Sequence, residues 1–102
     1  MGHPHYQVTS SDLKSADAAI SAIGGYVHGI TLIPDGTNAC SLVVYDNAST
    51  NSGLVLAKLA LPATTTAPQS ITFNNPVSAN KGIYADVTGT GANYIVYYSQ
   101  GI

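Results

Sequence analysis

The clearest pattern in the chain is a pair of apolar runs, residues 39–45 and 54–61, on either side of the polar segment 46–53. The polar segment is rich in Asn, Ser and Thr and ends in glycine. Such residues bond their own backbone or accept a positive φ, so they favour turns. Two apolar runs joined in this way are typical of a β-hairpin. The pattern therefore predicts a central hairpin over residues 39–61.

The faces of this hairpin follow from Lys58, the charged residue of its second strand, which must face solvent. Strict alternation then places Leu54 and Leu56 on the solvent side together with Lys58. The same alternation predicts a core side made of Val55, Ala57, Leu59 and Leu61. Apolar residues nevertheless occur on both sides of both strands. This indicates either central strands or strands with one face in a subunit contact.

Residues 26–33 predict the strand that precedes the hairpin. Alternation along it places Val27 on the face opposite to Ile30. Gly29 lies in the middle of the strand and predicts a bulge or a close approach of another backbone segment. His28 stands among apolar neighbours, where we expect a structural role for it.

The rest of the chain shows short strands separated by turns and loops. Further strands are predicted over residues 71–73, 83–88 and 93–99. The predicted connections are turns at 34–37 and 74–76, a loop at 62–70 and a tight hairpin connection at 89–92. The inward residues of 83–88 are expected to be Ile83, Ala85 and Val87. In the last strand, one side is expected to hold Tyr94, Val96 and Tyr98, and the other Ile95 and Tyr97.

The segment before residue 25 is the part of the chain with two possible structures. Pro4 disfavours helix and predicts an extended arm over residues 1–11. A helical stripe runs through residues 11–23, at Leu13, Ala16, Ile20 and Ile23. The many small residues of the same segment favour an irregular strand instead, and both alternatives stay open.

Turn signals recur roughly every 8 to 12 residues, which is typical of an all-β domain. We therefore predict a single antiparallel β-sandwich or jelly-roll-like barrel of six to eight strands. The division of the chain is an N-terminal arm with its following segment, residues 1–24, and a β-sandwich domain, residues 25–102.

Charge changes this picture because the chain has so little of it. Charged residues make up 8% of the sequence, against about 25% in a typical soluble domain, and Glu and Arg are absent. An uncharged polar coat repels neighbours weakly, which suits an ordered assembly or a stable secreted domain. The net charge of −2 offers no basic surface for nucleic acid. We therefore do not expect nucleic acid as a partner. We do not expect a membrane either, because no apolar run approaches the ~18 residues of a membrane helix.

No motif in the sequence indicates an enzyme or a bound cofactor. Phosphate-binding loops, metalloprotease helices and nucleophile elbows are all missing from it. The carboxylates are scattered, and Asp35 and Asp46 adjoin turns that explain their presence. An enzyme would need a pocket that joins His28 to Asp46 or Asp86. We therefore predict a protein without catalytic activity.

Metal binding is not expected either. His3 and His5 share one face of an extended arm but lack a third ligand at a suitable spacing. Residues 46–51 offer oxygen ligands with a single carboxylate and no acidic closing residue, which excludes an EF-hand. The only cysteine, Cys40, begins a predicted strand, where burial in the core is the expected role.

The chain has seven tyrosines, which suit two kinds of surface. Sugar stacking needs exposed aromatic faces, which Tyr84, Tyr94, Tyr97 and Tyr98 on neighbouring predicted strands would provide. Tyrosine is also favoured at subunit contacts, because its ring is apolar while its hydroxyl stays wet, and we favour this interpretation. The residues predicted to contact a partner or another subunit are Tyr6, Val8, Tyr84, Tyr94, Tyr97 and Tyr98.

Several stretches in this order carry a family resemblance. They are GYVHGI at 25–30, YDNAS at 45–49 with SG at 52–53, GIYADV at 82–87 and ANYIVYY at 92–98. Together they resemble small β-sandwich structural proteins of tailed bacteriophages, in particular capsid decoration or cement proteins.

The resemblance implies a location in the virion, on the outer capsid surface, and contact with the major capsid protein. It also implies a homo-oligomer, with a trimer as the preferred state, and it brings neither catalytic residues nor cofactors. The predicted function is that of a decoration protein that stabilises the capsid lattice. The alternative is a carbohydrate- or host-surface-binding module of a phage tail or fibre.

Overall fold

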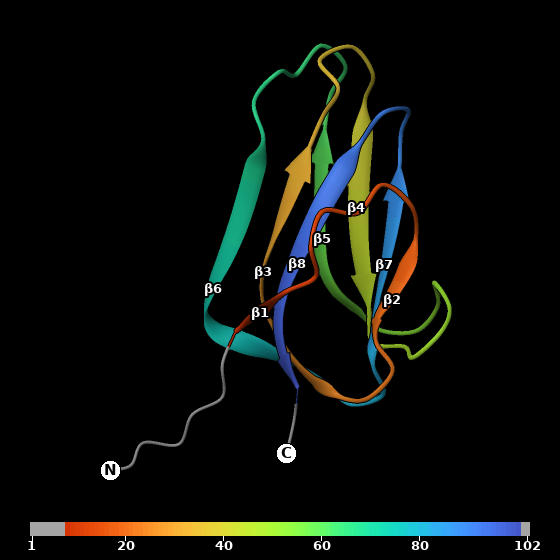
Figure 1. Cartoon of the computed structure of the whole chain (residues 1–102), viewed down its shortest axis with the longest axis vertical. Helices are drawn as coiled ribbons and strands as arrows, with labels where there is room; N and C mark the ends of the chain where they lie inside the picture. Colours follow the sequence, from red (N-terminus) through yellow and green to blue (C-terminus); the bar gives the residue numbers. More distant parts are fainter. Residues whose placement is uncertain (1–7, 101–102) are drawn as a thin grey trace.

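Eight strands form two four-stranded antiparallel sheets that pack face to face in the computed structural model, which describes residues 8–100 (Figure 1). The predicted all-β sandwich of six to eight antiparallel strands is therefore confirmed. Sheet A contains, in spatial order, β1 (Thr9–Ser10), β8 (Asn93–Gln100), β3 (Gly25–Ile33) and β6 (Gln69–Ala79). Sheet B contains, in spatial order, β2 (Ala18–Ser21), β7 (Ile83–Thr88), β4 (Cys40–Tyr45) and β5 (Val55–Leu61).

Most connections in this part of the chain cross from one sheet to the other. Within residues 8–100, only β4 and β5 are neighbours both in the sequence and in a sheet. The strand orders 1-8-3-6 and 2-7-4-5 make a jelly roll, the double-sheet arrangement that is built from two Greek keys. The hairpin predicted at residues 89–92 is therefore wrong, because these residues carry the chain from β7 in sheet B to β8 in sheet A.

Residues 8–24 contain β1 and β2 and no helix, so the strand alternative for residues 11–23 is the right one. β1 pairs with β8 and β2 pairs with β7. The helical stripe does not form because a helix would need its apolar side chains buried. Leu13 and Ile23, at the two ends of the stripe, are 59% and 54% exposed.

The core lies between the two inner faces and draws on both sheets. Its completely buried apolar side chains are Val27, Ile30, Leu32, Leu42, Val44, Ile83, Ala85, Tyr94 and Val96. The alternation predicted for the last two strands is confirmed, since their inward residues are buried or pack against the core. The burial predicted for Cys40 is also confirmed.

A bulge in β3 breaks the strict alternation of that strand. Between the pairs that Val27 and Gly29 form with β8, His28 is an extra residue. A Cβ atom at Gly29 would lie 2.6 Å from the carbonyl oxygen of Ile71. The bulge and the close approach expected at Gly29 are therefore both present. The extra residue turns Val27 to the core side together with Ile30, so the predicted placement of Val27 on the opposite face is wrong.

A second irregularity shifts the faces of β5. Val44 pairs with Ala57 and Tyr45 pairs with Val55, which makes Leu56 the extra residue. Leu56 is buried beside Ala57, whereas Val55 is 48% exposed, so the predicted faces of these two residues are wrong. β4 lies inside sheet B but β5 forms its edge. Only one strand of the predicted central hairpin is therefore central.

β6 continues through the turn that was predicted at residues 74–76. The register of β6 against β3 shifts here, and residues 73–76 lie opposite His28 alone. β6 forms the edge of sheet A, seen as the teal strand at the left of Figure 1. An edge strand tolerates Pro76 because proline need not donate to a second neighbouring strand. Residues 74–76 therefore interrupt the regular pairing of β6 with β3 but do not end the strand.

Candidate functional site

Charged residues are distributed unequally between the two sheets. The four strands of sheet A contain no Asp, Glu, Lys or Arg. Sheet B carries Lys58 on β5 and Asp86 on β7, and both pair with Val43 of the strand between them. Sheet A is therefore the side of the sandwich whose strands carry no permanent charge.

The outward residues of sheet A form rows across its strands. One row joins Ile95 of β8, Thr31 of β3 and Ser70 of β6. The hydroxyl oxygens of Thr31 and Ser70 are hydrogen-bonded at 2.7 Å. The next row joins Tyr97 to Thr72 through β3. Because the residues that alternate with them point into the core, these five side chains point outward, and we call them the sheet A face.

The residues predicted to make contacts do not form one surface. Tyr97 belongs to the sheet A face, whereas Tyr84 lies on the outer face of sheet B and pairs with Tyr45. Tyr98 packs against the core. Tyr94 is completely buried, so its selection as a contact residue is wrong, because the alternation of β8 turns it inward. The tyrosine platform considered as the less favoured alternative, for sugar stacking, is not formed, since β7 and β8 belong to different sheets.

The remaining predicted contact residues come from the N-terminal arm. Val8 precedes β1 and is 53% exposed. Tyr6 lies outside the described residues, as do His3 and His5. The end of the arm, Thr9–Ser10, pairs with β8 of its own chain. Residues 9 and 10 thus belong to the sandwich itself.

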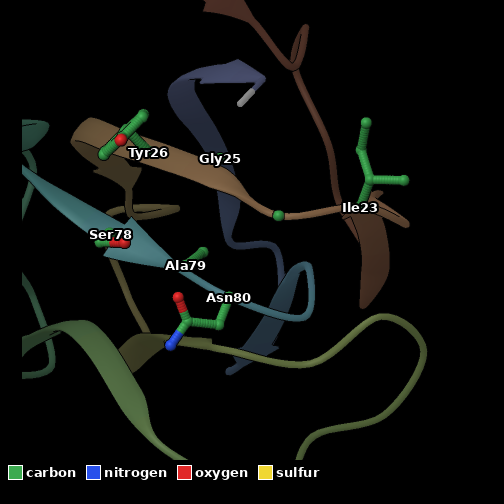
Figure 2. A pocket seen from close by; sticks show the side chains of 7 residues that line it. Ile23, Gly25, Tyr26, Ser78, Ala79 and Asn80 are labelled. Atoms are coloured by element: carbon green, nitrogen blue, oxygen red, sulfur yellow. The ribbon is translucent and has the colours of Figure 1, made fainter. Parts of the chain in front are cut away.

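A cleft opens where β3 begins and β6 ends. It has a volume of about 360 Å³ and is lined by Ile23, Gly24, Gly25, Tyr26, Ser78, Ala79 and Asn80. Tyr26 is 40% exposed and pairs with Ser78 across the two strands. Figure 2 shows the two side chains on adjacent strands, with Asn80 further along the chain. This cleft, which we call the Tyr26 cleft, therefore combines one exposed aromatic ring with neutral polar groups.

Sequence reasoning missed this cleft because the pairing of Tyr26 with Ser78 depends on the register beyond the β3 bulge. One signal was available in the pair Gly24 and Gly25. A Cβ atom at Gly24 would lie 2.6 Å from the carbonyl oxygen of Ala79. The glycine pair thus marks the place where β3 and the end of β6 approach each other closely.

The residues that an enzyme would need to bring together have separate partners. His28 Nε2 lies 2.9 Å from the hydroxyl of Ser99, which is only 1% exposed. Asp86 accepts a hydrogen bond of 3.0 Å from the side-chain amide of Asn51. Asp46 accepts backbone hydrogen bonds from another loop. None of His28, Asp46 and Asp86 lines the Tyr26 cleft.

Asp46 directly follows β4, and its hydrogen bonds connect the end of this strand to the turn between β6 and β7. Its carboxylate is buried and accepts hydrogen bonds from the backbone N–H groups of Lys81 at 2.7 Å and Gly82 at 3.4 Å. Burial opposes the ionisation of Asp46. These N–H groups, together with that of Asn80, outweigh burial and hold the pKa of the carboxyl below its usual value. Asp46 is therefore a structural carboxylate that joins two connections.

Asp35 has the turn role that its sequence position predicts. Its Oδ1 accepts hydrogen bonds of 2.8 Å from the backbone N–H groups of Thr37 and Asn38. Donation from Asn38 and then from Thr37 lowers the pKa of Asp35. The carboxylate thus closes the turn after β3 on its own backbone.

Among residues 8–100, no three His, Cys, Asp or Glu side chains gather closely enough to hold a metal ion. Asn47 organises the loop after β4 instead, because its Oδ1 accepts from the backbone N–H groups of Ser49 and Thr50. This described part of the chain also contains no helix that is long and apolar enough to cross a membrane.

Comparison of the chain with protein-family models, with curated proteins and with solved structures gives no match. The resemblance to phage decoration proteins therefore stays a prediction. Two surfaces of the described residues are candidates for binding a partner, the sheet A face and the Tyr26 cleft.

Proposed function

We propose that this protein is a capsid decoration protein that binds the major capsid protein through the sheet A face and stabilises the capsid lattice. One observation carries the proposal, the absence of charged residues from all four strands of sheet A. Protein interfaces disfavour Lys, Glu and Asp and favour tyrosine. Burying the sheet A face against a partner would therefore remove Ile95 and Tyr97 from water without burying an unpaired charge.

The jelly-roll arrangement supports the proposal by analogy. Jelly rolls occur in viral capsid proteins and in lectins, although a fold alone does not fix a function. The proposed location is the outer surface of the virion. The proposed oligomer is a trimer, as the resemblance implies, because decoration proteins often occupy three-fold positions of a lattice.

Charge introduced on the proposed surface tests this function. Ile95→Asp and Tyr97→Asp place a carboxylate in the sheet A face, and both should reduce binding to capsids that lack the protein by tenfold or more. Val43→Asp is the matched control, since Val43 lies on the outer face of sheet B and gains the same charge. Equal binding by all three variants would remove the sheet A face from the mechanism.

Deletion variants test whether the N-terminal arm contributes to capsid binding. Removal of residues 1–7 leaves β1 in place, whereas removal of residues 1–11 also takes away its pairing with β8. We expect the shorter deletion to weaken binding while thermal unfolding stays unchanged. Unchanged capsid binding after removal of residues 1–7 would exclude this part of the arm from the capsid contact.

A second candidate function is favoured by the Tyr26 cleft, which suits a neutral sugar. Its tyrosine ring offers a stacking surface, and Ser78 and Asn80 offer neutral hydrogen-bonding groups. In that case Tyr26→Ala should abolish the chemical-shift changes that a glycan titration produces in NMR spectra. Copy number separates the two functions: gel densitometry of purified virions should give hundreds of copies of a decoration protein and few copies of a tail or fibre module.

A further inference from the structure

The four edge strands of the sandwich are protected to different degrees. An edge strand exposes unpaired backbone N–H and C=O groups, and short, charged or irregular edges avoid pairing with other chains. β1 has two residues, and β2 has four with a register shift. β5 carries Lys58 and is interrupted at Leu56. Three of the four edges therefore carry at least one of these protections.

The first half of β6 carries none of these protections. β6 is 11 residues long and contains no charged residue. Its pairing with β3 is regular from Gln69 to Thr72, and the shift and Pro76 come only afterwards. Ser70 and Thr72 are exposed, and the strand stands at the outer side of the molecule in Figure 1. Residues 69–72 thus form a neutral and regular edge, which we call the β6 edge.

We propose that the β6 edges of two copies of this chain pair antiparallel about a two-fold axis. The pairing joins the two copies of sheet A into one continuous sheet through backbone hydrogen bonds. It also brings Ile71 of one copy near Ile71 of the other, where both already pack partly against their own cores. This contact uses the backbone edge of β6, whereas the capsid contact proposed above uses outward side chains of sheet A, and Ser70 and Thr72 belong to both surfaces. It forms between free copies of the chain, whereas the trimer proposed above forms on the capsid.

We choose a second copy of the chain as the partner because the β6 edge is suited to pair with itself about a two-fold axis. Such a contact uses the same surface on both partners, so each residue faces the same stretch of the other chain. A charged residue in this stretch would face a like charge, which destabilises strand pairs. The β6 edge has no charge to repel its copy, and the net charge of the whole chain is only −2. By contrast, pairing of β5 with its copy would bring two lysines together.

The pairing is short, so the association should be weak and should rise with protein concentration. Sedimentation velocity of the purified protein, without capsids, measures it directly. Thr72→Lys places a charge in the β6 edge and should leave the protein monomeric at concentrations where the unmodified protein dimerises. Ala60→Lys, on the exposed side of the β5 edge, adds the same charge as a matched control and should dimerise normally.

A charge-swap experiment completes the test. Thr72→Lys and Thr72→Asp should each be monomeric alone and should associate when mixed, since the opposite charges then lie close together across the axis. The proposal is wrong if the unmodified protein stays monomeric at all concentrations or if Thr72→Lys associates like the unmodified protein. Loss of association in the Ala60→Lys variant alone would place the contact at β5, and loss only on deletion of residues 1–7 would place it at the arm. Both results would overturn the proposal.

Discussion

The hydroxyl of Tyr94 donates a hydrogen bond of 2.7 Å to the backbone carbonyl oxygen of Ala16. Tyr94 is completely buried on β8 of sheet A. Ala16 belongs to the segment between β1 and β2, which carries the chain from sheet A to sheet B. One buried side chain therefore fixes this first crossover to the core.

Tyr94→Phe should destabilise the protein by about 1–2 kcal/mol, because it keeps the ring in the core but leaves the Ala16 carbonyl without this donor. Chemical denaturation followed by circular dichroism measures the change. Tyr97→Phe removes the same hydroxyl from the outward side of β8 and should change the stability by less than about 0.5 kcal/mol. Equal effects of the two substitutions would show that the Tyr94–Ala16 bond does not matter for stability.

The titration of Tyr94 predicts a loss of stability at high pH. Burial raises the pKa of Tyr94 to about 12, with a further contribution from the negative charge of Asp17. In the unfolded chain the same phenol titrates near 10. Between these two values the folded state holds more protons, so the free energy of unfolding falls as the pH rises from about 10 to 12. Denaturation at several pH values should show a shallower fall for Tyr94→Phe than for the unmodified protein.

Asp46→Ala should be among the more destabilising single substitutions in the connections between strands. It leaves the backbone N–H groups of Lys81 and Gly82 without their acceptor, and hydrogen bonds to a charged group contribute about 1.5–3 kcal/mol each. Asp46→Asn should cost less, because its amide oxygen still accepts one bond. Asp12→Asn, at an exposed position, is the control and should stay near the stability of the unmodified protein.

Acid should remove the contribution that the ionised carboxylate of Asp46 makes to the stability of the fold. The pKa of this carboxyl is lowered from its usual 3.8 in the folded protein, so the unfolded chain binds the proton first as the pH falls. The stabilisation is therefore complete above about pH 4 and is lost as the pH falls through the lower folded pKa. The stability difference between the unmodified protein and Asp46→Asn should shrink on going from pH 7 to acid. A difference that is independent of pH would contradict the role assigned to the ionised carboxylate.

The sequence predicts the strands better than their partners, and β7 and β8 show why. Alternation is a local property, so the inward residues of both strands follow from the pattern alone. Whether residues 89–92 join neighbours in one sheet or cross between two sheets depends on the whole strand order. That order places Tyr84 and Tyr97 in different sheets, so the alternative of a shared tyrosine platform does not hold.

Bulges limit the prediction of faces in the same way. The extra residues His28 and Leu56 are defined by the strands that lie opposite them, and only Gly29 gave a local signal for one of the two. The scarcity of charge could be read from composition. Its confinement to sheet B and the connections became visible only once the strands had been assigned to sheets.

Gly29 provides the last prediction, because the backbone of β6 approaches it closely. A methyl group there would lie 2.6 Å from the carbonyl oxygen of Ile71. This oxygen belongs to backbone that pairs with β3, so it can move away only if the strand pair shifts. Overpacking of this kind typically costs about 1–3 kcal/mol, and Gly29→Ala should lower the midpoint of urea denaturation accordingly.

A matched control for Gly29→Ala lies on the same pair of strands. Ser70→Thr also adds one methyl group but does so at an exposed position of β6, and it keeps the hydroxyl that bonds Thr31. We expect Ser70→Thr to unfold within about 0.5 kcal/mol of the unmodified protein. If Gly29→Ala unfolded at the same urea concentration as this control, the approach of the Ile71 carbonyl would not be what requires glycine in the bulge.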